Sequence, residues 1–113
     1  MPVTIYHNPR CSKSRETLAL LEEHGAKPRI IEYLKTPPSE AELKRLLGKL
    51  GMSARQLVRR KEAKEAGIDV DALAEDALVA AMVKHPAAIE RPIVVNGDKV
   101  ALGRPPENVL AIL

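Results

Sequence analysis

The single cysteine of the chain, Cys11, is the residue whose type and surroundings best suit covalent chemistry. It lies in a short polar loop between a β-type run at residues 3–6 and an amphipathic helical pattern at residues 16–24. A strand, a loop and a helix in that order place the thiol at a helix N-terminus, where unpaired backbone N–H groups and the helix dipole favour an anion. We therefore expect Cys11 to be a nucleophile in an anion-binding loop.

Basic residues surround this thiol in the sequence. Arg10, Lys13 and Arg15 lie within four residues of Cys11, and His7 lies four residues before it. Neighbouring cations lower the pKa of a thiol and favour the thiolate, which is its reactive form. A lone cysteine is more commonly a small buried apolar residue, but polar and basic neighbours are poor surroundings for one. We predict a depressed pKa for Cys11 and a fold that does not depend on its thiol.

Three arginines at expected loop edges, Arg59, Arg91 and Arg104, are candidate anion ligands. Arginine presents a planar fork of donors that pairs bidentately with an oxyanion. Arg91 and Arg104 flank one end of an expected hairpin, which makes them a credible pair. Arg59 stands in a basic run, where a solvated surface charge is the commoner outcome, and Arg60 beside it is an open alternative.

Three further residues of the loop could support the thiol. His7 could orient or deprotonate Cys11, or it could be a structural histidine beneath the loop, and the sequence leaves both possibilities open. Asn8 and Ser14 are candidate hydrogen-bond donors to the thiolate. Metal binding is not expected, because the three histidines show no ligand spacing and one cysteine cannot build a structural zinc site. A phosphatase-type Cys-x5-Arg loop does not fit either, since Arg15 follows Cys11 by only four residues.

Composition limits the compartment and the partners. The chain has 113 residues, a net charge of +3 and two aromatic residues, so a base-stacking surface for nucleic acid is not expected. With one cysteine the chain cannot form an internal disulfide, so the cysteine content does not indicate an oxidising compartment. The longest apolar run, residues 77–83, is too short to span a bilayer. We expect a cytoplasmic monomer without a bound metal or cofactor and without a membrane or nucleic-acid partner.

The periodicity of the sequence predicts an α/β protein of about four strands. A helical pattern separates the first two strands, so these two should be parallel. The last two should form a hairpin around Asn96-Gly97-Asp98. A last helix should turn Val109, Leu110 and Leu113 to the core. The whole chain, 1–113, is expected to be one domain with an all-helical insertion at about 38–88. The predicted strands cover residues 3–6, 29–33, 91–95 and 99–102, and helix is expected across 62–84 except at 67–69.

Short motifs along the chain carry a family resemblance. His7-Asn8-Pro9-x-Cys11 with Ser14-Arg15-x-Thr17-Leu18 resembles the loop of the ArsC family, the glutaredoxin-coupled arsenate reductases with a thioredoxin-like fold. The resemblance covers almost the whole chain in order. One departure is Cys11-Ser12-Lys13-Ser14, where well-characterised reductases resemble Cys-Gly-Thr-Ser. The other matching motifs are Tyr33-Leu34-x-x-Pro37-Pro38, Leu57-Val58-Arg59, His85-Pro86, Arg91-Pro92-Ile93-Val94-Val95 and Gly103-Arg104-Pro105.

The resemblance implies a fold, a reaction and partners. It implies a thioredoxin-like mixed sheet flanked by helices, with a cis peptide bond at Arg91-Pro92. It implies that Cys11 attacks arsenate or a similar oxyanion, and that glutathione as co-substrate and glutaredoxin as partner resolve the adduct. The substrate ligands would be Arg59, Arg91 and Arg104, and the supporting residues His7, Asn8, Ser14 and Arg15.

Two other functions stay open from the sequence. Members of the ArsC-like family that bind RNA polymerase are similar around Arg91-Pro92-Ile93 and are regulators without enzymatic activity. A monothiol glutaredoxin-like thiol reductase would fit the Cys-x-x-Ser spacing of Cys11 and Ser14 but leaves the three arginines unexplained. Enzymatic oxyanion chemistry explains both the thiol and the arginines, and it is the function that the sequence favours.

Overall fold

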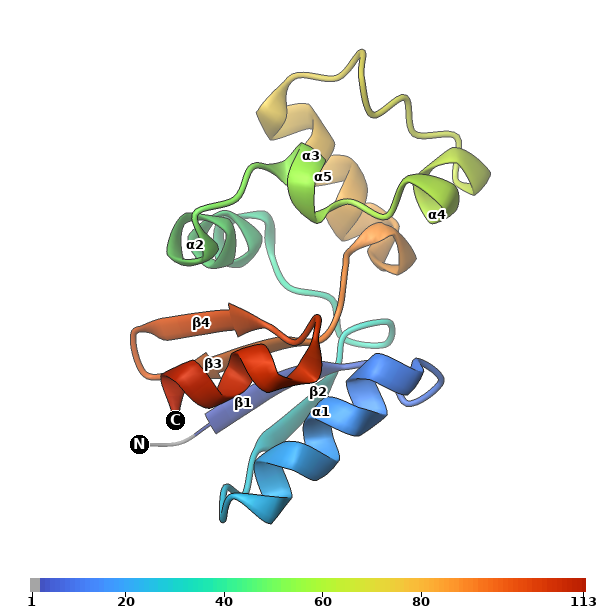
Figure 1. Ribbon diagram of the computed structural model, residues 1–113. Coiled ribbons are helices and arrows are strands. Elements are labelled where there is room, and N and C mark those ends of the chain that lie inside the picture. The colour runs from blue at the N-terminus through green and yellow to red at the C-terminus, as the bar shows by residue number, and fades with distance from the viewer. Residues whose placement is uncertain (1–2) are drawn as a thin grey trace. The chain divides into compact units, whose positions relative to one another are not determined.

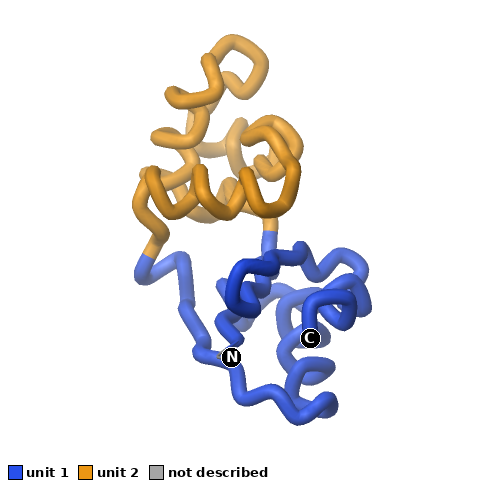
Figure 2. The backbone as a smooth tube through the Cα atoms, turned by 90° about the vertical axis from the view of Figure 1, so that its left-hand side faces the viewer, with its two compact units in different colours: residues 1–36, 91–113 blue, residues 37–90 orange. Residues whose placement is uncertain are grey.

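The computed structural model describes residues 3–113 and divides the chain into two compact units (Figures 1 and 2). The first unit joins Met1–Thr36 to Arg91–Leu113, and the second is Pro37–Glu90. The first unit therefore contains both ends of the chain, and the second is inserted between its halves.

A four-stranded mixed sheet forms the centre of the first unit. The strands lie in the order β2-β1-β3-β4, with β1 parallel to β2 and antiparallel to β3. The intervening helix carries the chain back to start β2 in the same direction as β1, as predicted. The hairpin also forms as predicted, with Gly97 at a φ of 63° in its turn. The strands are β1 (Val3–His7), β2 (Arg29–Glu32), β3 (Ile93–Asn96) and β4 (Lys99–Leu102).

Two helices cover this sheet: α1 (Ser12–Glu23) and a 3₁₀ helix, η2 (Pro106–Ile112). They lie beside each other, and Leu21 of α1 shares a buried cluster with Val109 and Ile112 of η2. The prediction that Leu110 and Leu113 face the core is wrong for Leu113, which is 44% exposed. In a 3₁₀ helix residues three apart share a face, so Val109 and Ile112 are buried together.

The second unit is built from helices. Leucines repeat at helical spacing on α2, which places Leu43, Leu46 and Leu47 in the core beside Leu78 and Met82 of α5. Ser39 caps α2 by accepting a hydrogen bond from the Glu42 N–H at 3.1 Å, and serine is among the residues preferred at this position. The helices are α2 (Glu40–Leu50), α3 (Ala54–Leu57), α4 (Arg60–Glu65), α5 (Glu75–Lys84) and a 3₁₀ turn, η1 (Pro86–Ala88).

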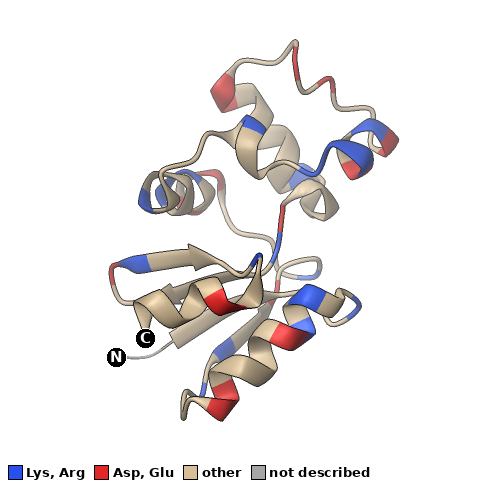
Figure 3. Cartoon of the chain, in the orientation of Figure 1, with Lys and Arg blue, Asp and Glu red and all other residues tan. Residues whose placement is uncertain are grey.

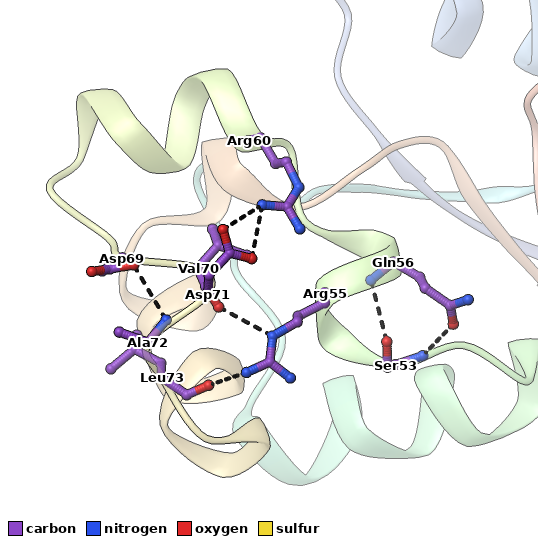
Figure 4. A network of polar contacts seen from close by, with 9 residues as sticks. All are labelled: Ser53, Arg55, Gln56, Arg60, Asp69, Val70, Asp71, Ala72 and Leu73. Carbon is purple, nitrogen blue, oxygen red and sulfur yellow. Dashed lines mark hydrogen bonds and ion pairs between the residues drawn. The ribbon is translucent and has the colours of Figure 1, made fainter.

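The break between α4 and α5 is longer than predicted. Helix was expected to resume after residue 69, whereas α5 begins at Glu75. Arg55 donates hydrogen bonds to the carbonyl oxygens of Val70 and Leu73, at 3.3 and 2.7 Å (Figure 4). These bonds satisfy loop carbonyls that a helix would otherwise have used, and sequence periodicity gives no sign of them.

The predicted fold class is confirmed: a mixed sheet of four strands flanked by helices, with an all-helical insertion in the middle of the chain. The inserted unit covers Pro37–Glu90. That the two units together form one domain stays a prediction.

Candidate active site

Cys11 occupies the N-cap position of α1, at the end of the loop that leaves β1. Its N–H donates to the Asn8 carbonyl, and its own carbonyl accepts from the Arg15 N–H, both at 3.0 Å. The residue is partly exposed. The thiol therefore lies at a helix N-terminus, as the order of strand, loop and helix predicts, with the first backbone N–H groups of α1 near its sulfur.

Two arginines that are distant from Cys11 in the sequence act on its sulfur. Arg104 Nη1 lies 3.9 Å from Cys11 Sγ and 3.1 Å from the Arg91 carbonyl oxygen. The Arg91 side chain also acts on this thiol and lowers its pKa. The prediction that Arg91 and Arg104 form a pair is consistent with this geometry, and the pair surrounds the thiol with donors that suit an oxyanion.

These donors lower the pKa of Cys11. Burial acts to raise the pKa of this thiol, but the Ser14 and Lys13 N–H groups and the Arg91 and Arg104 side chains outweigh it, so the pKa lies below the ordinary value. The predicted direction is the one that the structure gives. The thiolate is therefore favoured by backbone donors close in sequence and by guanidinium groups distant in sequence.

The charged groups of the basic residues nearest to Cys11 in sequence interact with partners other than its sulfur. Lys and Arg gather at the start of α1 (Figure 3). However, Lys13 pairs with Glu16 at 3.5 Å, and Arg15 donates to the Pro9 carbonyl at 2.9 Å. Of these residues, Lys13 is among the groups that lower the pKa of Cys11, and it acts through its backbone N–H rather than its ammonium. The attribution of the depressed pKa to the three neighbouring cations is therefore wrong.

His7 lies at the end of β1, 6% exposed, with Nδ1 2.6 Å from the Ser14 hydroxyl. Burial lowers the pKa of His7; Glu32 opposes this shift and Arg15 adds to it. Because its Nδ1 is bonded to the Ser14 hydroxyl, this buried imidazole suits a support beneath the loop better than a base acting on the sulfur. The contact thus favours the structural one of the two roles that the sequence left open.

The other two supporting residues also hold the loop. The Ser14 hydroxyl accepts a hydrogen bond from the Asn8 N–H at 3.1 Å, and it is the backbone N–H of Ser14 that lowers the pKa of the Cys11 thiol. The Asn8 side chain accepts from the Arg10 N–H at 3.0 Å. Both residues are buried. Their side chains set the loop conformation, while the donors to the thiol come from the backbone and from Arg91 and Arg104.

Arg59 and Arg60 both belong to the second unit, and their surroundings differ. Arg59 bonds Glu62 at 3.1 Å and Glu90 at 2.8 Å, with 24% of its side chain exposed. Burial lowers the pKa of Arg59, but the two carboxylates raise it above the ordinary value. Arg60 is exposed and pairs with Asp71 at 3.2 Å (Figure 4). Arg60 is therefore a solvated surface charge, whereas Arg59 is partly buried and paired with two carboxylates.

Known proteins resemble this chain over its full length. A family model described as the ArsC family matches residues 6–112. The chain belongs to the ArsC family. A protein of Neisseria meningitidis serogroup A named arsenate reductase is 51% identical and covers 98% of this chain and 97% of its own. A Haemophilus influenzae protein of the same name is 51% identical over the full length of both chains. The solved structure of an arsenate reductase from Vibrio cholerae is 56% identical, with a TM-score of 0.93, and covers 100% of this chain and 98% of its own.

The cis peptide bonds of this ArsC protein lie beside both arginines at the thiol. Arg91-Pro92 is cis, as the family resemblance implied, and Arg104-Pro105 is cis as well. The second was not predicted. Its sequence signal is only an Arg-Pro pair after a strand, which is equally compatible with a trans bond.

The described part of this ArsC chain contains neither a candidate metal site nor a candidate membrane span. Between residues 3 and 113, no group of three or more His, Cys, Asp or Glu side chains could hold a metal ion. No helix in that range is long and apolar enough to cross a membrane.

Cys11 should react as a thiolate at a pH below that of an ordinary thiol. The rate of alkylation rises as the thiol ionises, so its midpoint in pH reports the pKa of the folded protein. We expect this midpoint below about 8.5, the ordinary thiol value. Iodoacetamide alkylation across a pH series gives the value directly, because Cys11 is the only cysteine in the sequence. The same protein in denaturant is the matched control, and equal midpoints in both states would contradict the depressed pKa.

Proposed function

We propose that this ArsC-family protein is an oxidoreductase of the arsenate reductase type, with the Cys11 thiolate as nucleophile. One observation carries the proposal: Arg104 Nη1 lies 3.9 Å from the Cys11 sulfur, and Arg91 and the first backbone N–H groups of α1 act with it to lower the pKa of this thiol. Donors that stabilise a thiolate also suit the oxygens of a tetrahedral oxyanion approaching it. The names of relatives about 50% identical supply arsenate as the substrate.

In the proposed first step, the sulfur lone pair of Cys11 forms a bond to arsenic, and one arsenate oxygen leaves as water after taking up protons. Arsenic remains As(V) in this adduct. Arg91 and Arg104 neutralise charge on the arsenate oxygens. Without these guanidinium groups, the negative charges of the thiolate and of arsenate would repel each other. The guanidinium groups thus lower the barrier that electrostatic repulsion adds to the attack.

Reduction of the adduct needs electrons from outside the chain. As(V) becomes As(III) when two thiols are oxidised to one disulfide, and this sequence has one cysteine. We propose glutathione as the external thiol and glutaredoxin as the protein that reduces the resulting mixed disulfide, as the ArsC resemblance implies.

A coupled assay on the purified protein tests this function. Arsenate-dependent oxidation of NADPH, through glutathione reductase, glutathione and glutaredoxin, should require every component. Omission of arsenate is the background control, and phosphate at equal concentration is the substrate control. No arsenate-dependent oxidation in the complete mixture would overturn the proposed activity.

One feature favours a second candidate, a glutathione-dependent thiol reductase. Cys11 and Ser14 have Cys-x-x-Ser spacing, and the Ser14 N–H is among the groups that lower the pKa of the Cys11 thiol. A mixed disulfide of glutathione with a small thiol, used in place of arsenate in the same assay, separates the two activities. Turnover of the mixed disulfide alone would favour this second function.

For the third arginine we propose Arg59 rather than Arg60. Its guanidinium is already held by Glu62 and Glu90, whereas Arg60 is exposed. Arg59→Lys removes the planar fork, so we expect kcat/KM for arsenate to fall by about tenfold or more. Arg60→Lys is the matched control and should leave kcat/KM unchanged.

The free energy of unfolding in urea should be measured for both variants. It shows whether a loss of turnover comes with a loss of stability from the broken ion pairs with Glu62 and Glu90. The opposite result, with Arg60→Lys impaired and Arg59→Lys active, would reassign the role to Arg60.

A further inference from the structure

Gly103 lies directly before Arg104 at a point of unusually close packing. A Cβ built on Gly103 would lie 2.6 Å from Thr17 Oγ1 and 2.8 Å from Pro92 Cγ, closer than real Cβ atoms approach. The φ of Gly103 is not positive, unlike that of Gly97, so its backbone conformation does not require glycine. Glycine is needed here because only a residue without a side chain fits between Thr17 and Pro92.

Both neighbours of Gly103 lead to the thiol. Thr17 is fully buried on α1, and its hydroxyl donates to the Lys13 carbonyl at 2.7 Å, with the Gly103 carbonyl 3.4 Å away. On the other side, the Gly103 N–H donates to the Pro92 carbonyl at 2.9 Å. The Lys13 N–H is among the groups that lower the pKa of the Cys11 thiol. The contacts of Gly103 therefore connect the first turn of α1 to the segment that carries Arg104.

We propose that Thr17 and Gly103 are positioning residues that fix the separation between Arg104 and the Cys11 sulfur. The inference rests on the proposed function only in taking Cys11 as the reacting thiol. The Thr17 side chain is β-branched and stiff within a helix, and the Pro92 ring is rigid. Any atom added at Gly103 must therefore move the backbone that carries Arg104.

The contact between Arg104 and the sulfur is sensitive to such movement. Arg104 Nη1 is 3.9 Å from Sγ, which is already long for a hydrogen bond, so a further shift removes it. A misplacement of about 1 Å in an active site can cost on the order of a hundredfold in rate. Gly103 and Thr17 contribute to catalysis through this distance, without touching the substrate.

Gly103→Ala tests the proposal through the reactivity of the thiol. We expect the pH midpoint of Cys11 alkylation to rise and the KM for arsenate to increase about tenfold or more. Gly48→Ala is the matched control, because a Cβ on Gly48 meets nothing within 4 Å and α2 tolerates alanine. The control should keep the wild-type midpoint and KM.

Thr17→Ala tests the same contact from the other side. Without its side chain, Gly103 loses the surface that it packs against, so the midpoint should again rise. In the double variant the new Cβ at position 103 enters the space that Thr17 left, and the midpoint should lie closer to wild type than in Gly103→Ala. Recovery stays partial because the Pro92 ring still obstructs the Cβ.

The alkylation midpoint distinguishes a positioning role of Gly103 and Thr17 from a role in packing alone, because a loss of packing would change stability without changing the midpoint. A wild-type alkylation midpoint in folded Gly103→Ala, whatever its loss of stability, would overturn the proposal. If that variant does not fold, a wild-type midpoint in Thr17→Ala would overturn it equally. Alkylation needs no arsenate, so a midpoint that moves as expected in a protein inactive on arsenate would sink the proposed function and leave this inference standing.

Discussion

Cys11→Ser is expected to abolish arsenate turnover while the protein stays folded. A serine hydroxyl is far less ionised at neutral pH than a thiol whose pKa is depressed, and it is a weaker nucleophile toward arsenic. We expect kcat/KM to fall by more than about a thousandfold, since loss of a covalent nucleophile has effects of that size or larger. The coupled arsenate assay measures it, with wild-type protein at equal concentration.

The fold should tolerate this change because Cys11 contributes little packing. It is partly exposed at the N-cap of α1, where its side chain makes no capping hydrogen bond. Serine is among the preferred N-cap residues, so the free energy of unfolding should stay within about 1 kcal/mol of wild type. Urea unfolding followed by circular dichroism gives this value. A loss of several kcal/mol would mean that the thiol is structural, and retained turnover would exclude it as the nucleophile.

Arg104→Lys should lower kcat/KM for arsenate by about tenfold to a hundredfold. The positive charge remains, but the planar fork is lost, and Arg104 Nη1 no longer reaches the Cys11 sulfur and the Arg91 carbonyl together. Each charge-assisted hydrogen bond is worth roughly 1.5–3 kcal/mol, which corresponds to that range in rate. The alkylation midpoint should rise less than in Arg104→Ala, since lysine keeps the charge near the thiolate.

A matched control for this substitution is Arg45→Lys on α2. Arg45 also forms a forked contact, to Glu42, but on an exposed surface of the second unit. Exposed pairs of this kind contribute little, so turnover should match wild type. If Arg104→Lys turns over arsenate as well as Arg45→Lys, the oxyanion-binding role of Arg104 is wrong.

Two of the predictions from sequence are wrong for different physical reasons. The predicted face of the last helix assumed 3.6 residues per turn, and the 3₁₀ geometry of η2 exposed Leu113 instead. The loop before α5 is extended because Arg55 bonds to its carbonyls from 15 and 18 positions earlier in the chain. The Arg55 bonds are contacts with a distant segment, and a local sequence pattern does not contain them.

The amino-acid sequence by itself determined the local frame of the site. Four strands, the helical insertion and a thiol at the N-terminus of α1 follow from periodicity, turn residues and the order of neighbouring segments. The backbone donors of Lys13 and Ser14 follow too, because any helix start presents its first N–H groups in this way.

Only the tertiary structure decided which side chains reach the sulfur. Lys13 and Arg15 are close in sequence, yet their charged groups lie on Glu16 and on the Pro9 carbonyl. Arg104 is 93 positions away and contacts Cys11 because the antiparallel strands β3 and β4 return the chain beside β1. A long side chain points where its neighbours in space leave room and offer partners, and those neighbours come from strand pairing and core packing between distant segments.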